Sequence, residues 1–378
     1  MEQYDVVVIG AGVMGAATAY HLARRGRRVL LLEQFAIGHE RGSSHGHSRI
    51  FRLAYDSVDY IRLAQAALPL WRELEQLSGS ELLCLTGGLD VADRATPAIA
   101  ATQTALRACG LSYELLDRTT AAKRFPQFAL GEGMVGLYQP TSGFLDATSS
   151  VLALVDQARR HGAVVSDEDP VLAIQPRSMG VEVRTRGATY AAERLVITAG
   201  SWARPLLRQL GLDLPLTVTK EQFAFFRPHE PELFDVERCP IFIHHGNPSV
   251  YGFPMAGLPG VKVAFHGNGP VIAPESMDQS IEPEALVVLH AHLARLMPRA
   301  AGELIHAQTC RYTTTPDHEF IIDQHPEHAQ ILIGSPCSGH GFKFGILIGA
   351  ILADLAEQGK TEHAIERFRL ARFAGLTA

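Results

Sequence analysis

The feature that most constrains the fold is a glycine pattern near the N-terminus, within the stretch VVVIGAGVMGAATAYHLARRGRRVLLLE. An apolar β-branched run, a helical spacing of apolar residues and a second apolar run follow one another, at residues 4–9, 13–25 and 28–32. Gly10, Gly12 and Gly15 stand at the turn from the first run into the helix. This order predicts a βαβ unit of the kind that binds a dinucleotide.

Each glycine has a separate steric task in such a unit. Gly10 permits the tight turn, Gly12 lets the backbone approach a pyrophosphate, and Gly15 lets helix and strand pack closely. Glu33 closes the second strand, where its carboxylate can accept hydrogen bonds from ribose hydroxyls. An acid at this position disfavours a phosphorylated ribose, but the motif alone does not separate FAD from NAD.

Length and composition predict a globular protein of two domains. The chain of 378 residues exceeds the usual size of one hydrophobic core, and its 47% hydrophobic and 20% charged residues are ordinary for a globular protein. The net charge of -6 offers no basic field to nucleic acid or to an anionic membrane. No apolar run reaches the ~20 residues that span a bilayer. We therefore expect neither a nucleic-acid partner nor a membrane association.

The cysteines are odd in number, scattered and without CxxC pairs, at Cys84, Cys109, Cys239, Cys310 and Cys337. This pattern argues against a disulfide framework and against a structural zinc site, and no metal site is predicted. The cysteine pattern is typical of a protein in a reducing cellular compartment. Because the N-terminal stretch also lacks the features of an export signal, we expect a cytoplasmic location.

The order of strand and helix patterns predicts a mixed α/β (α+β) fold. A Rossmann-like nucleotide-binding domain is expected from three separated segments, 1–80, 140–215 and 305–378. A mostly antiparallel β substrate domain is expected to be inserted, from residues 81–139 and 216–304. Residues 34–55 have no apolar period and predict a long loop, which in a compact domain is usually functional.

The stretch SPCSGHGFKFGILIGAIL favours a flavin. Ser338, Gly339 and Gly341 predict a turn with outward-facing backbone N–H groups, Lys343 adds a cation, and a helix follows at once. Reduced flavin carries negative charge near N1, which a helix N-terminus or a cation stabilises. The alternative is an ordinary glycine-rich helix start with a solvated lysine.

Taken together, the motifs resemble a known family of flavoproteins in order and spacing over nearly the whole chain. They are GAGVMGAATAYHL, GSSHGHSRIFRLAY, VITAGSW, YGFP, CRYTTTPDHEFIID and SGHGFKF. The chain resembles the monomeric sarcosine oxidase and N-methyltryptophan oxidase family, which includes the pipecolate oxidases. The resemblance implies FAD as cofactor, an amine-oxidising reaction and a monomer, so the nucleotide-binding domain is expected to be an FAD-binding domain.

By the same resemblance, Cys310 in the stretch CRYTTTPDHEFIID is the covalent attachment point of the flavin. A thiolate there bonds to the 8-methyl carbon of the isoalloxazine ring, which requires access to the flavin edge and a positive neighbourhood. Without the motif, an isolated cysteine is more often a small core residue.

The resemblance also assigns the substrate site. Arg52 and Lys343 match the pair that binds the substrate carboxylate, for which an arginine has suitable bidentate geometry. Arg49 matches a position close to the flavin face, and Lys262 matches the lysine that activates oxygen by stabilising developing negative charge. His266 is expected to line the pocket and to influence amine protonation. Further matches to pocket or cofactor positions are Tyr251, Tyr312, His45, Val171, Gly200 and Gly341.

We therefore expect an FAD-dependent oxidase of secondary amino acids, with O2 as acceptor and hydrogen peroxide as product. The substrate stays open between sarcosine, a bulkier N-methyl amino acid and a cyclic imino acid such as L-pipecolate. The family's bacterial sarcosine oxidases carry a Gly-Glu-Gly lid where this chain reads YDSVDY after the matching tyrosine, so the lid differs. A dehydrogenase with another acceptor and a flavin-binding module without turnover are the remaining alternatives.

Overall fold

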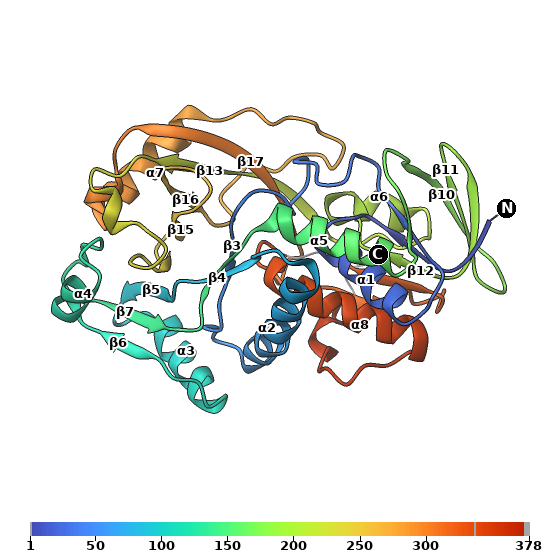
Figure 1. The fold of residues 1–378 in the computed structure, drawn as a ribbon, viewed down its shortest axis with the longest axis horizontal. Helices are drawn as coiled ribbons and strands as arrows, with labels where there is room; N and C mark the ends of the chain where they lie inside the picture. The colour runs from blue at the N-terminus through green and yellow to red at the C-terminus, as the bar shows by residue number, and fades with distance from the viewer. Residues whose placement is uncertain (1, 336–337, 374–378) are drawn as a thin grey trace.

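The computed structural model describes residues 2–335 and 338–373. Figure 1 shows an elongated molecule with two large sheets toward its two ends and a group of helices below their junction. The N-terminus lies at the end that holds the first sheet. Cys337 lies outside the described ranges.

The N-terminal βαβ unit forms as predicted. Strand β1 (Glu2–Ile9) runs into α1 (Val13–Arg24), and β2 (Val29–Leu32) returns parallel to β1 with Val6 opposite Val29. The first sheet has the order β10-β11-β12-β1-β2-β9, and β19 pairs with both β12 and β18. Its other strands are β9 (Val164–Ser166), β10 (Val171–Pro176), β11 (Val181–Thr185), β12 (Thr189–Ile197), β18 (Ile322–Gln324) and β19 (Ile331–Gly334).

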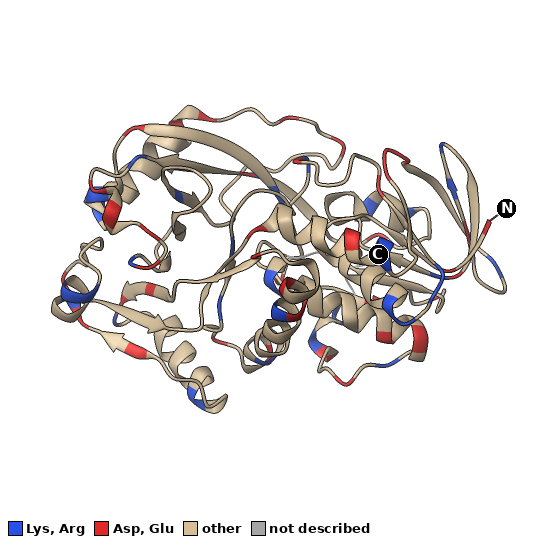
Figure 2. Ribbon diagram, viewed as in Figure 1, with Lys and Arg blue, Asp and Glu red and all other residues tan. Residues whose placement is uncertain are grey.

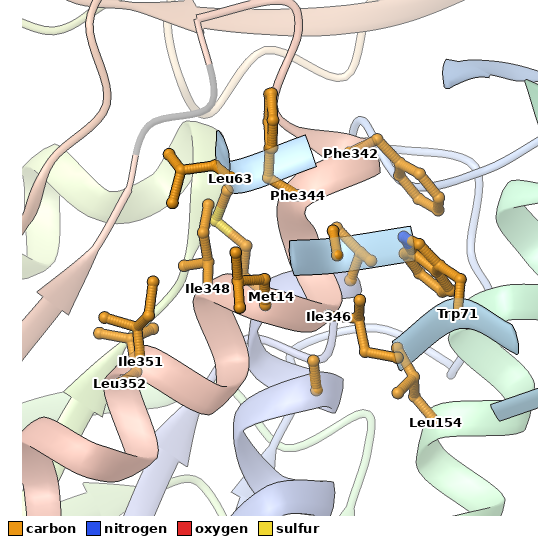
Figure 3. Packing of buried hydrophobic residues seen from close by; sticks show 14 of the residues in the cluster. Met14, Leu63, Trp71, Leu154, Phe342, Phe344, Ile346, Ile348, Ile351 and Leu352 are labelled. Carbon is orange, nitrogen blue, oxygen red and sulfur yellow. The ribbon is translucent and has the colours of Figure 1, made fainter. Parts of the chain in front are cut away.

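The helices beside this sheet pack against one another, with small residues where α1 and α8 meet. Helix α1 contacts both α5 (Ala147–Arg160) and α8 (Gly345–Gln358). A Cβ built on Gly349 of α8 would lie 2.4 Å from the Cβ of Ala17 in α1, so the helices approach as closely as glycine allows. Figure 3 shows α8 side chains meeting Met14 of α1, Leu154 of α5 and Trp71 of α2 (Val58–Ser78) in one core.

The second sheet is antiparallel except at one pair of strands, as predicted for the inserted segment. Its order is β17-β13-β16-β15-β14-β5-β7-β6, with β14 parallel to β5. The strands are β5 (Gly88–Asp93), β6 (Glu114–Leu116), β7 (Met134–Gln139), β13 (Thr217–Phe226), β14 (Ile241–His244), β15 (Val250–Met255), β16 (Val261–Phe265) and β17 (Leu304–Thr314).

The segment predicted as one long loop contains a strand. Residues Arg49–Phe51 form β3, which joins β8 (Gly143–Leu145) and β4 (Leu83–Leu85) in a small sheet. The prediction failed here because β3 is too short to show a period and is stabilised by pairing with residues about a hundred positions away. The remaining helices are α3 (Pro97–Ala108), α4 (Arg118–Arg124), α6 (Ala203–Arg208) and α7 (Pro283–Leu296).

The mixed α/β architecture is confirmed, whereas the exact domain boundaries stay a prediction. The boundary predicted at residue 305 falls inside β17, which pairs along its length with β13 of the second sheet. Figure 2 shows acidic and basic residues interspersed along the elements. Among the described residues, no helix has both the length and the apolar character to cross a bilayer.

Candidate functional site

The first cavity lies where the glycine turn meets the carboxyl ends of the parallel strands. It has a volume of about 300 Å³, and five predicted cofactor residues line it: Gly10, Gly12, Glu33, Val171 and Gly200. The carboxylate of Glu33 is already oriented, because it accepts hydrogen bonds from the backbone N–H groups of Ala11 (2.8 Å) and Phe35 (3.0 Å).

Steric contacts explain why glycines occupy this turn. Gly10 has a φ of 96°, and a Cβ built there would lie 2.7 Å from the carbonyl oxygen of Thr198. A Cβ on Gly15 would lie 1.8 Å from the carbonyl oxygen of Gly10, so α1 touches the preceding turn. Gly12 caps α1 without a side-chain hydrogen bond, and the first turn of the helix carries no acid. This open, glycine-lined helix N-terminus fits the phosphates of a dinucleotide cofactor such as FAD.

The second cavity, of about 550 Å³, holds most of the predicted substrate and flavin-side residues. Ser43 and Phe342 line both cavities, so the two are adjacent. The predicted residues on its wall are Arg49, Arg52, Tyr251, His266, Cys310, Tyr312, Gly341 and Lys343. Lys262 and His45 do not line it but are buried at 3% and 0% exposure.

Strand register explains why residues far apart in the sequence meet there. Tyr251 on β15 lies opposite Ala264 on β16, which in turn lies opposite Phe223 on β13. Lys262 is two positions from Ala264, so it shares the same face of the sheet. Tyr251, Ala264, Phe223 and Lys262 therefore lie on one face of the second sheet.

The side-chain amine of Lys262 is buried within hydrogen-bonding reach of the loop before β3. Its Nζ donates to the carbonyl oxygen (3.2 Å) and Oγ (3.1 Å) of Ser48 and lies 4.1 Å from the centre of the Phe223 ring. Burial, followed by the nearby charge of Arg49, lowers the pKa of Lys262 well below its usual range. An anion arriving nearby would stabilise the protonated form of this side chain.

The two predicted carboxylate-binding cations converge on Tyr55. The guanidinium of Arg52 lies 4.2 Å from the centre of the Tyr55 ring, and Lys343 Nζ donates to the Tyr55 hydroxyl at 2.8 Å. Lys343 also donates to the carbonyl oxygen of His340 at 2.7 Å. Tyr55 therefore holds one wall of the pocket between both cations, a role that no local sequence pattern indicated.

Arg49 is held by the backbone of the loop that precedes β3. Its Nη1 donates to the carbonyl oxygen of Ser48 (2.9 Å) and its Nη2 to that of Ser43 (3.0 Å). These bonds fix a guanidinium at the boundary between the two cavities, because Ser43 lines both.

The two histidines predicted for the site differ in exposure, because His45 is fully buried whereas His266 is exposed at the second cavity. The surroundings of both disfavour the protonated ring. Burial, with Arg52 and Lys343 nearby, lowers the pKa of His266 to about 4. Burial, with Arg49 and Lys262 nearby, lowers the pKa of His45 to about 3. Neither ring nitrogen of His45 has a hydrogen-bond partner among the described residues. A buried ring without hydrogen-bond partners, close to Arg49 and Lys262, is the kind of group that a cofactor with donors and acceptors would satisfy.

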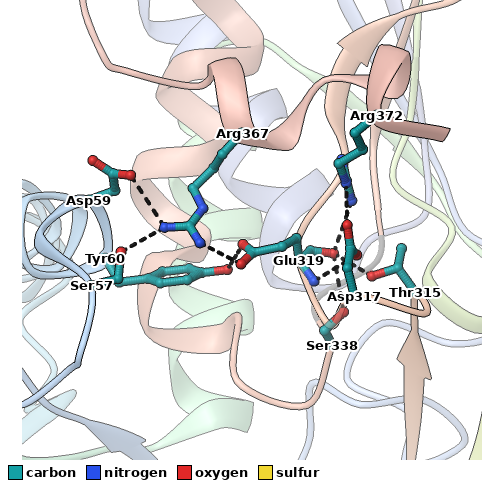
Figure 4. A network of polar contacts seen from close by, with 9 residues as sticks. All are labelled: Ser57, Asp59, Tyr60, Thr315, Asp317, Glu319, Ser338, Arg367 and Arg372. Carbon is teal, nitrogen blue, oxygen red and sulfur yellow. Dashed lines mark hydrogen bonds and ion pairs between the residues drawn. The ribbon is translucent and has the colours of Figure 1, made fainter. Parts of the chain in front are cut away.

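A polar network missed by the sequence analysis supports the far wall of the cavity. Figure 4 shows Tyr60 donating to Glu319 (2.6 Å), whose other oxygen accepts from Arg367 (2.6 Å), which also bonds Asp59 (3.2 Å). The Tyr60 ring stacks on Tyr55 with centroids 5.3 Å apart. The network joins the start of α2 to the C-terminal segment, and its members are too distant in sequence for a local pattern to reveal them.

The sequence and the fold of the chain are similar to those of known flavin-dependent oxidoreductases. A family model described as FAD dependent oxidoreductase matches residues 5–355. Monomeric sarcosine oxidase of Streptomyces avermitilis is 38% identical over 99% of both chains, and N-methyl-L-tryptophan oxidase of Yersinia pestis is 29% identical over 98% of this chain and 99% of that one. The solved structure of NikD, described as an unusual amino acid oxidase, superposes with a TM-score of 0.87 at 28% identity over 98% of both chains.

Proposed function

The chain belongs to the DAO family of FAD-dependent oxidoreductases, within the group of the monomeric sarcosine and N-methyltryptophan oxidases, and from this premise we propose that it oxidises a secondary amino acid. Sarcosine or another N-methyl amino acid is the proposed substrate, and O2 is the proposed acceptor. When bound, FAD would supply the electron-accepting chemistry for a hydride from the carbon beside the amine and for the reduction of O2 to hydrogen peroxide. The imine product is then hydrolysed by water.

The observation that carries this proposal is the convergence of two cations on one cavity wall. Arg52 and Lys343 flank Tyr55 in the cavity that also contains Cys310. Two fixed cations match an amino acid carboxylate, since a planar guanidinium and an ammonium both donate to its oxygens. A carboxylate held there would place the adjacent amine and carbon inside the cavity, whose wall also includes Arg49 and Tyr251.

Anaerobic mixing with candidate substrates tests the proposal directly. Sarcosine, N-methyltryptophan, L-pipecolate and proline would each be added to the purified flavoprotein, with the flavin absorbance followed over time. We expect an N-methyl amino acid to bleach the flavin, and peroxide to form when air is admitted. If none of the four bleaches the flavin, the proposed function is wrong.

We also propose that the flavin is attached covalently through Cys310. The support is its position on β17, where its side chain is 7% exposed and lines the second cavity. Cys310→Ala is expected to release all its FAD on acid precipitation, because no thioether can form. Wild-type protein is expected to give a yellow precipitate heavier by one FAD in mass spectrometry.

Cys109→Ala is the matched control for this variant, since Cys109 ends α3 and lines neither cavity. It should keep the acid-stable flavin. Acid-stable flavin in Cys310→Ala would place the attachment point elsewhere.

A monomer in the cytoplasm completes the proposal. The monomer is supported by relatives whose name contains the word monomeric, and the cytoplasmic location by the scattered cysteines of the sequence, which form no CxxC motif. Gel filtration of the purified holoprotein at several concentrations tests whether it is a monomer.

A further inference from the structure

Oxidation of a secondary amino acid requires a proton acceptor, and the inference drawn here rests on the proposed function. A secondary alkylamine has a pKa near that of lysine, about 10, so it reaches the protein as an ammonium ion. The carbon beside a protonated nitrogen does not release a hydride readily, because no lone pair is available to form the imine. One group in the cavity therefore has to accept the ammonium proton before the carbon is oxidised.

His245 has the geometry of such a group. It lines the second cavity with 26% of its side chain exposed, and its Nε2 lies 2.6 Å from Oδ1 of Asp90. A carboxylate can only accept in this contact, so Nε2 carries the hydrogen. The other ring nitrogen, Nδ1, then presents its lone pair. This arrangement, a buried carboxylate orienting a histidine, is the one by which general bases are fixed in a single tautomer.

The strand register builds the pair. Asp90 on β5 lies opposite Ile243 on β14, and the backbone N–H of His245 donates to the carbonyl oxygen of Val91 at 2.8 Å. Because side chains alternate along strands, Asp90, Ile243 and His245 share a face, the one that also carries Tyr251 opposite Ile243. The cavity side of the sheet is therefore where both members of the pair lie.

Asp90 also binds the predicted carboxylate anchor. Its Oδ1 accepts from Arg52 Nη1 at 3.3 Å, and the Asp90 side chain is 7% exposed. Arg52 Nη1 bonds the carbonyl oxygen of Ala54 as well, so these bonds use neither Nε nor Nη2. One buried carboxylate thus holds both a cation for the substrate carboxylate and a histidine for the neighbouring amine.

His266 and His340 also line the cavity, and the surroundings of each ring disfavour its protonated form. Burial lowers the pKa of His266 to about 4 and lowers the pKa of His340 well below its usual range, with cations adding to the effect in both. Taking a proton from an alkylammonium is correspondingly more costly for these rings. Among the described residues, neither ring is paired with a carboxylate within 4 Å, whereas His245 is.

We propose that His245 accepts the proton of the substrate ammonium, with Asp90 as its positioning residue. The N–H bond of the ammonium breaks, its electron pair stays on the amine nitrogen, and a new N–H bond forms at His245 Nδ1. The imidazolium is stabilised by Asp90 and returns its proton to water after the imine has formed. This step is a proton transfer that changes no oxidation state, so it needs no oxidant of its own.

The test is the pH dependence of anaerobic flavin bleaching at subsaturating sarcosine, or at another N-methyl amino acid that bleaches wild type. The charged and titratable groups that face His245 are Asp90 from β5, Arg52 after β3 and His266 after β16. Its chain neighbour His244 on β14 interacts with it electrostatically from the opposite face of the strand. His245→Gln retains a donor to Asp90 but no basic nitrogen. It is expected to bleach about 100-fold more slowly than wild type at neutral pH.

The difference in bleaching rate between wild type and His245→Gln should become smaller as the pH rises. Below the amine pKa, the fraction of neutral amine in solution rises about tenfold per pH unit, so the variant regains rate from amine that arrives already deprotonated. His244→Gln is the matched control, because its side chain alternates to the opposite face of β14. This control should follow the wild-type pH profile.

A second probe separates proton transfer from a purely structural role. N-(2,2,2-trifluoroethyl)glycine has an amine that its fluorines leave neutral at neutral pH, so it needs no proton acceptor. Wild type and His245→Gln are expected to bleach at equal rates with this probe. Equal rates with sarcosine at neutral pH, or an equally large loss with the fluorinated probe, would overturn the proposal.

Asp90→Asn provides an independent variant if His245→Gln does not fold. Its amide oxygen can still accept from Arg52, but the charge that stabilises the imidazolium is lost. It should show the same pH-dependent defect at smaller size, and an unchanged profile would also overturn the proposal. A wild type that is bleached by no amine at any pH refutes the proposed function itself, an outcome distinct from these.

Discussion

Gly15→Ala is expected to yield protein that neither binds FAD nor folds stably. The added Cβ would lie 1.8 Å from the carbonyl oxygen of Gly10 and 2.5 Å from Oγ1 of Thr198. Neither atom is free to move, because the Gly10 oxygen belongs to the dinucleotide turn and the Thr198 hydroxyl donates to the carbonyl oxygen of Ile9 at 2.9 Å. Helix α1 would have to lift from β1, which opens the core that it shares with α8.

The loss of stability in Gly15→Ala depends on whether the added Cβ clashes with side-chain or backbone atoms. Overpacking a side-chain core typically costs about 1–3 kcal/mol, and a clash with backbone is at least at the upper end of that range. Thermal unfolding and flavin content of the purified variant measure the loss. Gly187→Ala is the control, since a Cβ there meets nothing closer than 3.6 Å. A Gly15→Ala protein with wild-type flavin content would contradict the close packing.

Lys262→Met is expected to abolish rapid reaction with oxygen while leaving reduction by substrate intact. Lys262 is 3% exposed, and its charge lies beside Ser48 and the aromatic ring of Phe223. A cation in such a dry site strongly stabilises the anion that forms when O2 takes up an electron, and losing one such interaction costs about 100- to 1000-fold in rate. Methionine preserves the unbranched shape, so packing should change little.

Stopped-flow mixing separates the two half-reactions of this variant. Anaerobic bleaching by substrate should match wild type, and reoxidation by air-saturated buffer should be about 100- to 1000-fold slower. Lys220→Met is the matched control, because Lys220, like Lys262, is a buried lysine of the second sheet. Unlike Lys262, it pairs with Asp278 at 2.7 Å, and it lines neither cavity. Wild-type reoxidation in Lys262→Met would favour a dehydrogenase with another acceptor.

The residues that sequence reasoning identified act through local geometry or belong to motifs. Gly10, Gly12 and Gly15 were recognisable because a strand, a tight turn and a helix follow within a few positions, and the constraint on each glycine comes from its own backbone. The mostly antiparallel sheet was likewise expected from the order of strand and helix patterns along the chain. The strand β3 was missed, because three residues show no period and depend on pairing with β8.

The residues that hold the cavity wall in place could not be predicted from local sequence patterns. Tyr55 was quoted within a motif, yet only the fold brings Lys343 to its hydroxyl, from 288 positions away. Glu319 and Arg367 form the wall behind it although nothing in their own stretches marks them as partners of Tyr60. Such residues are set by sheet register and helix docking, which single-sequence patterns do not encode.

By itself, the sequence determined that this chain has a dinucleotide turn and the motifs of a flavin-dependent amine oxidoreductase. Backbone sterics at glycines and short motif spacings carry that information. Only the tertiary structure decided that Asp90 joins Arg52, 38 positions away, to His245, 155 positions away. The physical reason is that hydrogen bonds between side chains form wherever folding brings the strands together, and the parallel pairing of β5 with β14 is a property of the whole sheet.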